Sequence, residues 1–217
     1  MNNRHRSQST QKIKIAVGVS GGGRSLINLI EEQKNHWFDV ALVFSSSHEI
    51  AANDVARKYN IPLLVLDFGK SAREASAETL YATLEKLNID LVVLAGFLKL
   101  LPVKSQWSQK VINIHPALLP KFGGKGMHGH HVHEAVISAG ETKSGATIHY
   151  VNEKYDEGGI IARAIVEIES TWTADELARE VFEAEKKLLP TVIHALAQGT
   201  LPETRVKDYQ WKNGGLK

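Results

Sequence analysis

The 217-residue chain contains no cysteine, no long apolar run and almost no excess of charge of either sign. Without cysteine there are no disulfides, thiolate metal ligands or cysteine nucleophile. Because 26 lysines and arginines face 24 aspartates and glutamates, no basic field favours nucleic acid as a partner. No apolar run approaches the roughly 20 residues that span a bilayer. These absences predict a soluble, cytoplasmic protein that binds neither nucleic acid nor membranes.

The length and composition predict one globular domain with two polar ends. Hydrophobic residues make up 43% and charged residues 23%, which is typical of such domains. Residues 1–11 contain two arginines and no apolar segment of a secretory signal, so we expect a disordered tail there. The domain is expected to span 12–206, followed by a polar, peripheral tail at 207–217. These features do not distinguish a monomer from a homodimer.

Strand and helix patterns alternate along the first half of the chain. Strands are predicted from β-branched and apolar runs at 13–19, 40–44, 61–66, 91–95 and 111–115. This order predicts an α/β fold with a doubly wound, mostly parallel, Rossmann-like sheet. A β-hairpin region at 145–168 and a final helix at 174–197 complete the predicted fold. Pro190 predicts a kink or a break in that helix.

The fifth predicted strand carries two polar residues at its end. Pro116 marks that end because proline cannot donate to a sheet ladder. Asn113 and His115 are two residues apart, so their side chains project to the same side. An amide donor beside an imidazole is suited to stabilise an oxyanion formed in acyl transfer. The alternative is a strand end with a hydrogen-bonded structural histidine.

A glycine-rich turn follows the first predicted strand. Residues 20–25 read Ser-Gly-Gly-Gly-Arg-Ser, and an apolar helical pattern begins at Leu26. Glycines let backbone amides approach an anion, and a helix N-terminus adds a favourable dipole. The turn lacks the third glycine of a dinucleotide fingerprint and the Gly-Lys-Ser/Thr of a P-loop. A single phosphate held by Gly23, Arg24 and Ser25 fits the pattern better.

Two further features are not typical of residues on a solvated surface. Residues 97–101 include four large apolar side chains directly after a central strand, which either wall a pocket or pack under the next segment. Glu185 interrupts the apolar stripe of the final helix, between Val181 and Leu188. Because burying a lone carboxylate is costly, we expect a cation to meet it, either a substrate ammonium or a Lys or Arg.

The hairpin turn and a nearby histidine-rich segment offer further candidates. Asp156 lies in the acidic turn 152–159, which is either solvated or brings Asp156 to His115 to orient and charge the imidazole. No cysteine or carboxylate accompanies the histidines at a familiar zinc spacing, so we expect no metal. These histidines are His128, His130, His131 and His133.

Together these motifs resemble those of the phosphoribosylglycinamide formyltransferases, folate-dependent enzymes of purine biosynthesis. The most specific part combines Leu-Ala-Gly-Phe-Leu-Lys-Leu-Leu at 94–101, Asn-Ile-His-Pro-Ala-Leu-Leu-Pro at 113–120 and Asp-Glu-Gly-Gly at 156–159. Formyltransferases that use 10-formyltetrahydrofolate share this set. The resemblance runs from Lys12 to about Val206 and implies the formyltransferase fold.

The resemblance also implies roles for individual residues in transferring formyl from 10-formyltetrahydrofolate to glycinamide ribonucleotide. The implied catalytic residues are Asn113, His115 and Asp156. The implied substrate-binding residues are Gly23, Arg24 and Ser25 for the phosphate and Glu185 for the amine. The implied folate-binding residues are Arg73, Leu98, Lys99, Leu100, Leu101 and Asn113. Arg24-Ser25 departs from the usual Ser-Asn of the family, and the loop 122–130 is longer than usual.

Other functions stay open at this point. A formyltetrahydrofolate hydrolase would use the same three catalytic residues with water as the acceptor. An amino-sugar formyltransferase would also act on an amine of a phosphate-bearing molecule. A module that binds a phosphorylated metabolite without catalysis would need only the glycine-rich turn.

Overall fold

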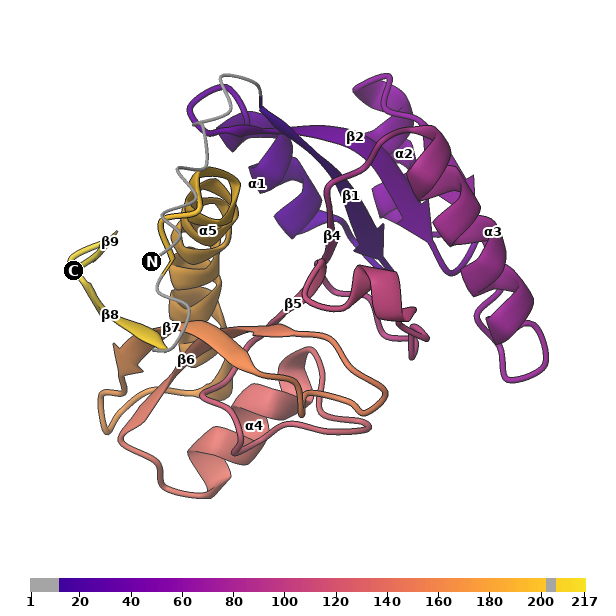
Figure 1. The fold of residues 1–217 in the computed structure, drawn as a ribbon. Helices are drawn as coiled ribbons and strands as arrows, with labels where there is room; N and C mark the ends of the chain where they lie inside the picture. The colour runs from indigo at the N-terminus through magenta and orange to yellow at the C-terminus, as the bar shows by residue number, and fades with distance from the viewer. Residues whose placement is uncertain (1–11, 202–205) are drawn as a thin grey trace, which may run out of the picture.

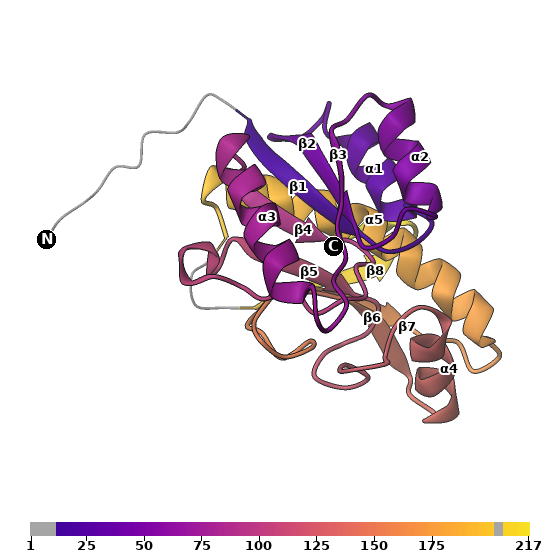
Figure 2. The same cartoon turned by 90° about the vertical axis from the view of Figure 1, so that its right-hand side faces the viewer.

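The computed structural model describes residues 12–201 and 206–217, so the expected tail at 1–11 lies outside the described residues. In the described ranges, one mixed sheet has the strand order β3-β2-β1-β4-β5-β6-β7-β8-β9 (Figure 1; β3 is labelled in Figure 2). The strands are β1 Ile13–Val19, β2 Phe38–Ser45, β3 Leu63–Val65, β4 Leu91–Leu94, β5 Val111–His115, β6 Lys143–Tyr150, β7 Ile160–Glu167, β8 Lys207–Lys212 and β9 Gly215–Leu216. The helices are α1 Arg24–Glu32, α2 Ala51–Lys58, α3 Arg73–Lys86, α4 His130–Ser138 and α5 Ala174–Gln198, with a short 3₁₀ helix at Ser105–Trp107.

The predicted doubly wound arrangement is confirmed. Strands β1 to β5 pair in parallel, whereas β6 runs antiparallel to both β5 and β7. Because β2 and β3 lie on one side of β1 and β4 and β5 lie on the other, the winding direction reverses between β1 and β4. The carboxyl ends of the strands at such a switch point form a crevice where ligands bind in this class of fold.

Helices cover the two faces of the sheet, which gives three layers. Alternate strand residues such as Ile15 and Val17 pack with α1, α2 and α5 on one face. Their neighbours, including Ala16 and Val92, pack with α3 on the other face (Figure 2). Both faces of the central strands are therefore buried, which explains their continuous apolar runs. Among the described residues, no helix has the length and apolar character needed to cross a membrane.

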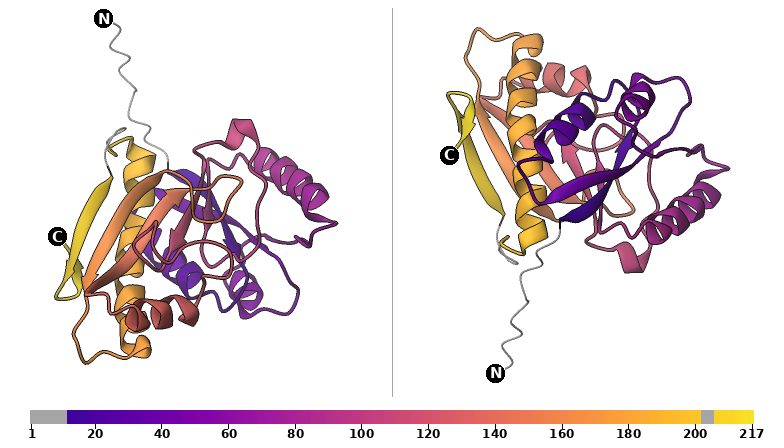
Figure 3. Two further views of the ribbon diagram at one scale, coloured as in Figure 1. Left: turned by 90° about the horizontal axis from the view of Figure 1, so that it is seen from below. Right: turned by 90° about the horizontal axis from the view of Figure 1, so that it is seen from above.

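The segment 207–217, expected to be a peripheral polar tail, instead forms β8 and β9 at the edge of the sheet (Figure 3). Strand β8 pairs in parallel with β7, and this register places Arg163 beside Asp208. The guanidinium donates two hydrogen bonds of 2.8 Å to that carboxylate. The polar composition of this segment did not predict a strand, because an edge strand keeps charged side chains toward solvent.

Pro190 does not break the last helix, because α5 continues as one helix to Gln198. Proline removes the N–H that would bond the carbonyl four residues earlier, which here belongs to Lys186. The buried side chain of Asn28 on α1 donates to that carbonyl, with an Nδ2–O distance of 2.9 Å. A side chain 158 residues away in the sequence therefore replaces the lost helical bond.

This contact predicts a coupled effect on stability. We expect Asn28→Ala to lower the free energy of unfolding by about 1–3 kcal/mol, because it leaves a buried carbonyl without a donor. In a Pro190→Ala background the loss should be smaller, since the new N–H can bond the Lys186 carbonyl. Urea denaturation of the four proteins measures this coupling, and an equal loss in both backgrounds would contradict it.

Candidate active site

A cavity of about 680 Å³ opens at the carboxyl ends of β1, β4 and β5. This volume is suited to a small-molecule ligand. Hydrogen bonds tie together the loops that follow β1 and β4: the Ser20 N–H donates to the Gly96 carbonyl at 2.9 Å, and the Leu98 N–H donates to Ser20 Oγ at 3.0 Å. The cavity therefore lies at the switch point of the sheet, between loops that hold each other in place.

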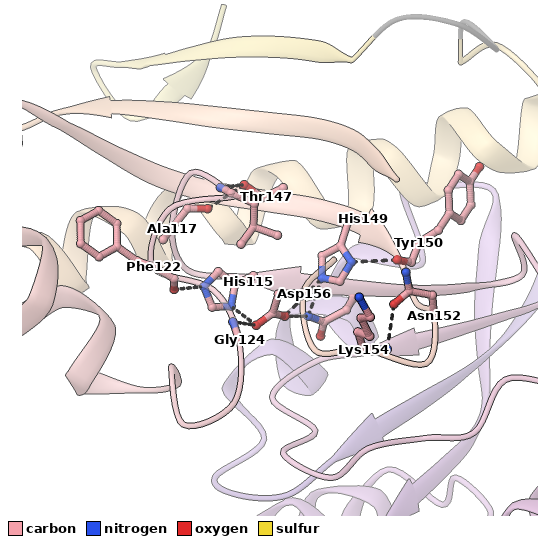
Figure 4. A network of polar contacts seen from close by, with 12 residues as sticks. His115, Ala117, Phe122, Gly124, Thr147, His149, Tyr150, Asn152, Lys154 and Asp156 are labelled. Carbon is pink, nitrogen blue, oxygen red and sulfur yellow. Dashed lines mark hydrogen bonds and ion pairs between the residues drawn. The ribbon is translucent and has the colours of Figure 1, made fainter. Parts of the chain in front are cut away.

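The end of β5 brings Asn113 and His115 into the cavity wall, as strand alternation predicts. His115 is buried, and its Nε2 donates to the Phe122 carbonyl at 2.7 Å. Its Nδ1 lies 3.6 Å from Asp156 Oδ2 (Figure 4). The structure thus brings Asp156 to His115 and favours that interpretation of the acidic turn over a solvated one.

Asp156 is the centre of the polar network. Its Oδ2 accepts from the Gly124 N–H at 2.9 Å (Figure 4). Its Oδ1 accepts from Asn113 Nδ2 at 3.3 Å. His149 Nε2 lies 3.4 Å from the same Oδ1. Burial acts to raise the pKa of Asp156, but the contacts with His149, His115 and Gly124 outweigh it and lower that pKa. Asp156 is therefore a fixed anion at neutral pH.

The surroundings of His115 do not favour the charge that the sequence led us to expect. Burial lowers the pKa of His115 below its usual value, against the opposing effects of the Asp156 carboxylate and the Phe122 carbonyl. His149 adds to the lowering. The neutral imidazole is thus favoured at pH 7, although both of its nitrogens face acceptors that would favour a second proton.

His149 and Thr147 were missed by the sequence reasoning. In the β5–β6 register, Asn113 lies opposite His149 and His115 lies opposite Thr147. Asn113 Nδ2 lies 3.0 Å from His149 Nε2, and Thr147 Oγ1 donates to the Ala117 carbonyl at 2.6 Å. The same polar–apolar alternation that identifies Asn113 and His115 is present in β6 and could have identified both residues.

The glycine-rich turn forms another wall of the cavity and precedes the N-terminus of α1. Gly23 has φ of 78°, and a Cβ atom there would lie 3.0 Å from the Ala52 backbone, so the position requires glycine. The Arg24 guanidinium carbon lies 4.0 Å from the centre of the Phe182 ring on α5. Ser25 also lines the cavity. The three residues predicted to hold a phosphate are therefore together.

Glu185 lines the same cavity from α5. Burial raises the pKa of Glu185 to about 7, although the positive charge of Arg24 opposes this shift. The predicted cation partner within the protein is therefore Arg24, and it compensates only part of the cost of burial. A carboxylate with this pKa changes its charge near neutral pH.

The residues predicted to bind folate do not all lie together. Leu98 lines the main cavity, whereas Lys99, Leu100 and Leu101 line an adjoining recess of about 50 Å³. Leu101 is also fully buried, so the segment both walls a pocket and contributes to the core. Arg73 lines neither space, and its Nε is buried with no partner in the described part of the chain.

Asn113 and Asp156 line both the main cavity and the recess. Of these two spaces, the cavity is lined by His115 and the recess by His149. A molecule bound in the cavity and a second one bound in the recess would therefore meet at the Asn113 amide and the Asp156 carboxylate. This arrangement suits transfer of a small group from one to the other.

The histidine-rich segment does not gather its imidazoles around one point. His130 lies 3.5 Å from Glu134 and 3.6 Å from Asp175, and His131 lies 3.2 Å from Glu134. His133 instead is buried in the cavity wall. Within 12–201 and 206–217, no group of three or more His, Cys, Asp or Glu residues is arranged to hold a metal ion.

Comparison with known proteins identifies relatives named for formyl transfer or for purine biosynthesis. The chloroplastic phosphoribosylglycinamide formyltransferase of Arabidopsis thaliana is 39% identical over 97% of this chain and 71% of its own length. The corresponding protein of Vigna unguiculata is 40% identical over 89% of this chain and 64% of its own length. The trifunctional purine biosynthetic protein adenosine-3 of Bos taurus is 34% identical, but this chain spans only 20% of it.

Solved structures give the same result. The phosphoribosylglycinamide formyltransferase of Anaplasma phagocytophilum has a TM-score of 0.79 and 29% identity, covering 93% of this chain and all of that one. The Coxiella burnetii enzyme of the same name has a TM-score of 0.79 and 31% identity, covering 87% and 89%. A family model described as formyl transferase matches residues 13–193. The chain therefore belongs to the formyl transferase family.

Proposed function

We propose that the protein transfers the formyl group of 10-formyltetrahydrofolate to the amino group of glycinamide ribonucleotide, a step of purine biosynthesis. The observation that supports this most is the position of Asn113 and Asp156, which line both the cavity and the recess. The names of the relatives and of the solved structures agree with this reaction.

The main cavity fits the acceptor. Its phosphate would meet the backbone amides of the turn at Gly23 and Ser25 and the N-terminus of α1. Arg24, held over the Phe182 ring, would add a planar pair of donors in place of the Ser-Asn usual in the family. Glu185 would receive the glycinamide amine as an ammonium ion and direct it toward β5.

The recess fits one side of the folate donor. Leu100, Leu101 and Phe97 give it apolar walls, which are suited to the faces of a pterin ring. The recess is smaller than a bicyclic ring, so we expect segment 98–100, in which Leu98 and Lys99 are exposed, to move outward when folate binds. Arg73 lies outside both spaces and would reach only the distal part of the folate.

In the proposed mechanism the ammonium ion first gives one proton to the Glu185 carboxylate, and the free amine then attacks the formyl carbon directly. The new oxyanion is met by the Asn113 amide and by the Nε2–H of His115, which it takes over from the Phe122 carbonyl. Asp156, a fixed anion, accepts the proton of the amine through water. That proton then passes to the folate nitrogen as the bond from this nitrogen to the formyl carbon breaks.

A single assay tests the assignment. Loss of formyl from 10-formyltetrahydrofolate is followed with glycinamide ribonucleotide, with an amino-sugar nucleotide or with water alone as the acceptor. The proposal expects rapid loss only with glycinamide ribonucleotide. Activity with water alone would identify a hydrolase instead, and activity only with the amino sugar would assign a different acceptor.

The cytoplasmic location inferred from composition stays a prediction, which cell fractionation would test. The protein is either a monomer or a homodimer, and analytical ultracentrifugation would distinguish the two.

Removing either member of the His115–Asp156 pair should abolish most turnover. We expect His115→Ala and Asp156→Asn each to lower kcat about a hundredfold or more, since one lost oxyanion donor costs roughly 3 kcal/mol. The control is His131→Ala, because His131 is exposed and does not line the cavity. Near wild-type kcat for both variants would contradict the proposed mechanism.

The raised pKa of Glu185 predicts opposite pH trends in binding and in stability. Because only the carboxylate binds an ammonium ion, kcat/KM for glycinamide ribonucleotide should rise as pH increases through about 7. The folded pKa exceeds the ordinary value of 4.5, so the folded protein binds the extra proton and loses stability as pH rises from 4.5 to about 7.

Glu185→Gln should therefore lack the rise of kcat/KM with pH near 7. It should also unfold at higher urea concentration than the wild type at pH 8, with the difference vanishing near pH 4. Glu183→Gln is the matched control, because Glu183 pairs with Lys186 outside the cavity. An unchanged profile in the Glu185 variant would show that another group titrates.

A further inference from the structure

The hydroxyl of Ser20 joins the walls of the cavity and the recess, although the proposed reaction gives it no role. Ser20 directly follows β1 and begins the glycine-rich turn. Its N–H donates to the Gly96 carbonyl at 2.9 Å, and its Oγ accepts from the Leu98 N–H at 3.0 Å. Ser20 itself lines neither the cavity nor the recess. Its side chain can therefore act on a ligand only through the segments that it holds.

The loop after β2 fixes the direction of this hydroxyl. Ser20 Oγ lies 2.8 Å from Ser46 Oγ, and either hydroxyl can donate in this pair. One proton and two lone pairs let Ser20 accept from Leu98 while it donates to Ser46. The buried Asn53 of α2 holds the same loop, because its Nδ2 donates to the Ser47 carbonyl at 2.8 Å. Ser20 is thus tied to a fixed part of the protein as well as to Leu98.

Leu98 lies where the two spaces adjoin. It lines the cavity, whereas the next three residues line the recess. Before it, the buried ring of Phe97 packs against Phe44, with 5.3 Å between the ring centres. Within the described residues, the main chain of 98–100 makes no hydrogen bond other than the one to Ser20. The Ser20 hydroxyl therefore holds the fixed end of the segment that we expect to move with folate.

The glycine-rich turn is the other element that begins at Ser20. Its residues Gly21 and Gly22 are exposed. An anion bound by the amides of this turn would restrict its motion. Because Ser20 begins the turn, the restriction extends through the hydroxyl to the Leu98 N–H. Folate then loses less conformational entropy when it orders 98–100, so each ligand favours binding of the other.

We propose that Ser20 is a positioning residue that couples the two spaces, so that a phosphate on the glycine-rich turn raises the affinity of the recess for folate. This inference rests on the proposed function, which assigns the turn to the phosphate and the recess to the folate donor. The coupling is reciprocal, because linkage requires folate to raise the affinity for the phosphate by the same factor. One hydrogen bond of this kind corresponds to about fivefold in affinity.

Calorimetric titration of the full chain with tetrahydrofolate tests the coupling. The titration is made alone, with saturating ribose 5-phosphate, and with ribose as a control that lacks the phosphate. In the wild type we expect ribose 5-phosphate, but not ribose, to lower the Kd of tetrahydrofolate about fivefold. Ser20→Ala should show no such change, because the Leu98 N–H loses its acceptor. A purely structural loss would weaken tetrahydrofolate binding but leave the ratio of the Kd values unchanged.

Two further variants separate the hydroxyl from its surroundings. Ser20→Thr keeps a hydroxyl at this position and should keep the coupling. Ser47→Ala is the matched control, because it removes a hydroxyl from the loop after β2 that accepts from the Glu49 N–H rather than contacting Ser20. This control should couple the two ligands as the wild type does.

The outcomes separate this inference from the proposed function. If the wild type does not bind both tetrahydrofolate and ribose 5-phosphate, both are wrong. Coupled binding that Ser20→Ala abolishes, without formyl transfer to glycinamide ribonucleotide, would overturn the proposed reaction and support the role of Ser20. If both ligands bind without coupling, or if Ser20→Ala couples them as strongly as the wild type, the role of Ser20 is wrong.

Should Ser20→Ala fail to fold, amide hydrogen exchange of the wild type replaces it. Exchange of the Leu98 N–H reports how often its bond to Ser20 opens. Ribose 5-phosphate should slow this exchange about fivefold, and an unchanged rate would overturn the inference.

Discussion

The arrangement of the site depends on one buried carboxylate, that of Asp156. It is held by the Gly124 N–H and by Asn113, and it lies beside the rings of His115 and His149. Four groups from three segments of the chain therefore converge on one anion. Because an unpaired carboxylate in this place would be costly, each contact that stabilises its charge also fixes the position of a neighbour.

The backbone is strained where this network is made. Asp156 has φ of 58° and Phe122 has φ of 56°, both in the left-handed region that non-glycine residues seldom adopt. These two residues supply the acceptors on either side of His115. Gly123 permits their close approach, since a Cβ atom there would lie 2.5 Å from Leu119 and 3.1 Å from Asp156. Strain kept at such a point indicates a functional arrangement that the surrounding contacts stabilise.

The parts of the protein that follow from local pattern could be predicted from the sequence. Strand alternation predicted that Asn113 and His115 lie on one side of the strand, and helical periodicity identified Glu185 as a carboxylate on an apolar stripe. Features that depend on distant partners could not. The continuity of α5 through Pro190 needs a donor from α1, and the charge of His115 depends on a balance between burial and Asp156 that no spacing reveals. The uptake of residues 207–217 into the sheet likewise depends on its partner in β7.

The surroundings of two carboxylates in one cavity shift their pKa values in opposite directions. Asp156 accepts from Asn113 and Gly124 and has a lowered pKa, whereas burial raises the pKa of Glu185 to about 7 against the positive charge of Arg24. Groups whose environments separate their pKa values in this way can take different tasks in one reaction. Asp156 can keep its charge while a proton passes through the site. Glu185 can gain charge as an ammonium group arrives, so that binding the amine stabilises the ionised form that burial disfavours.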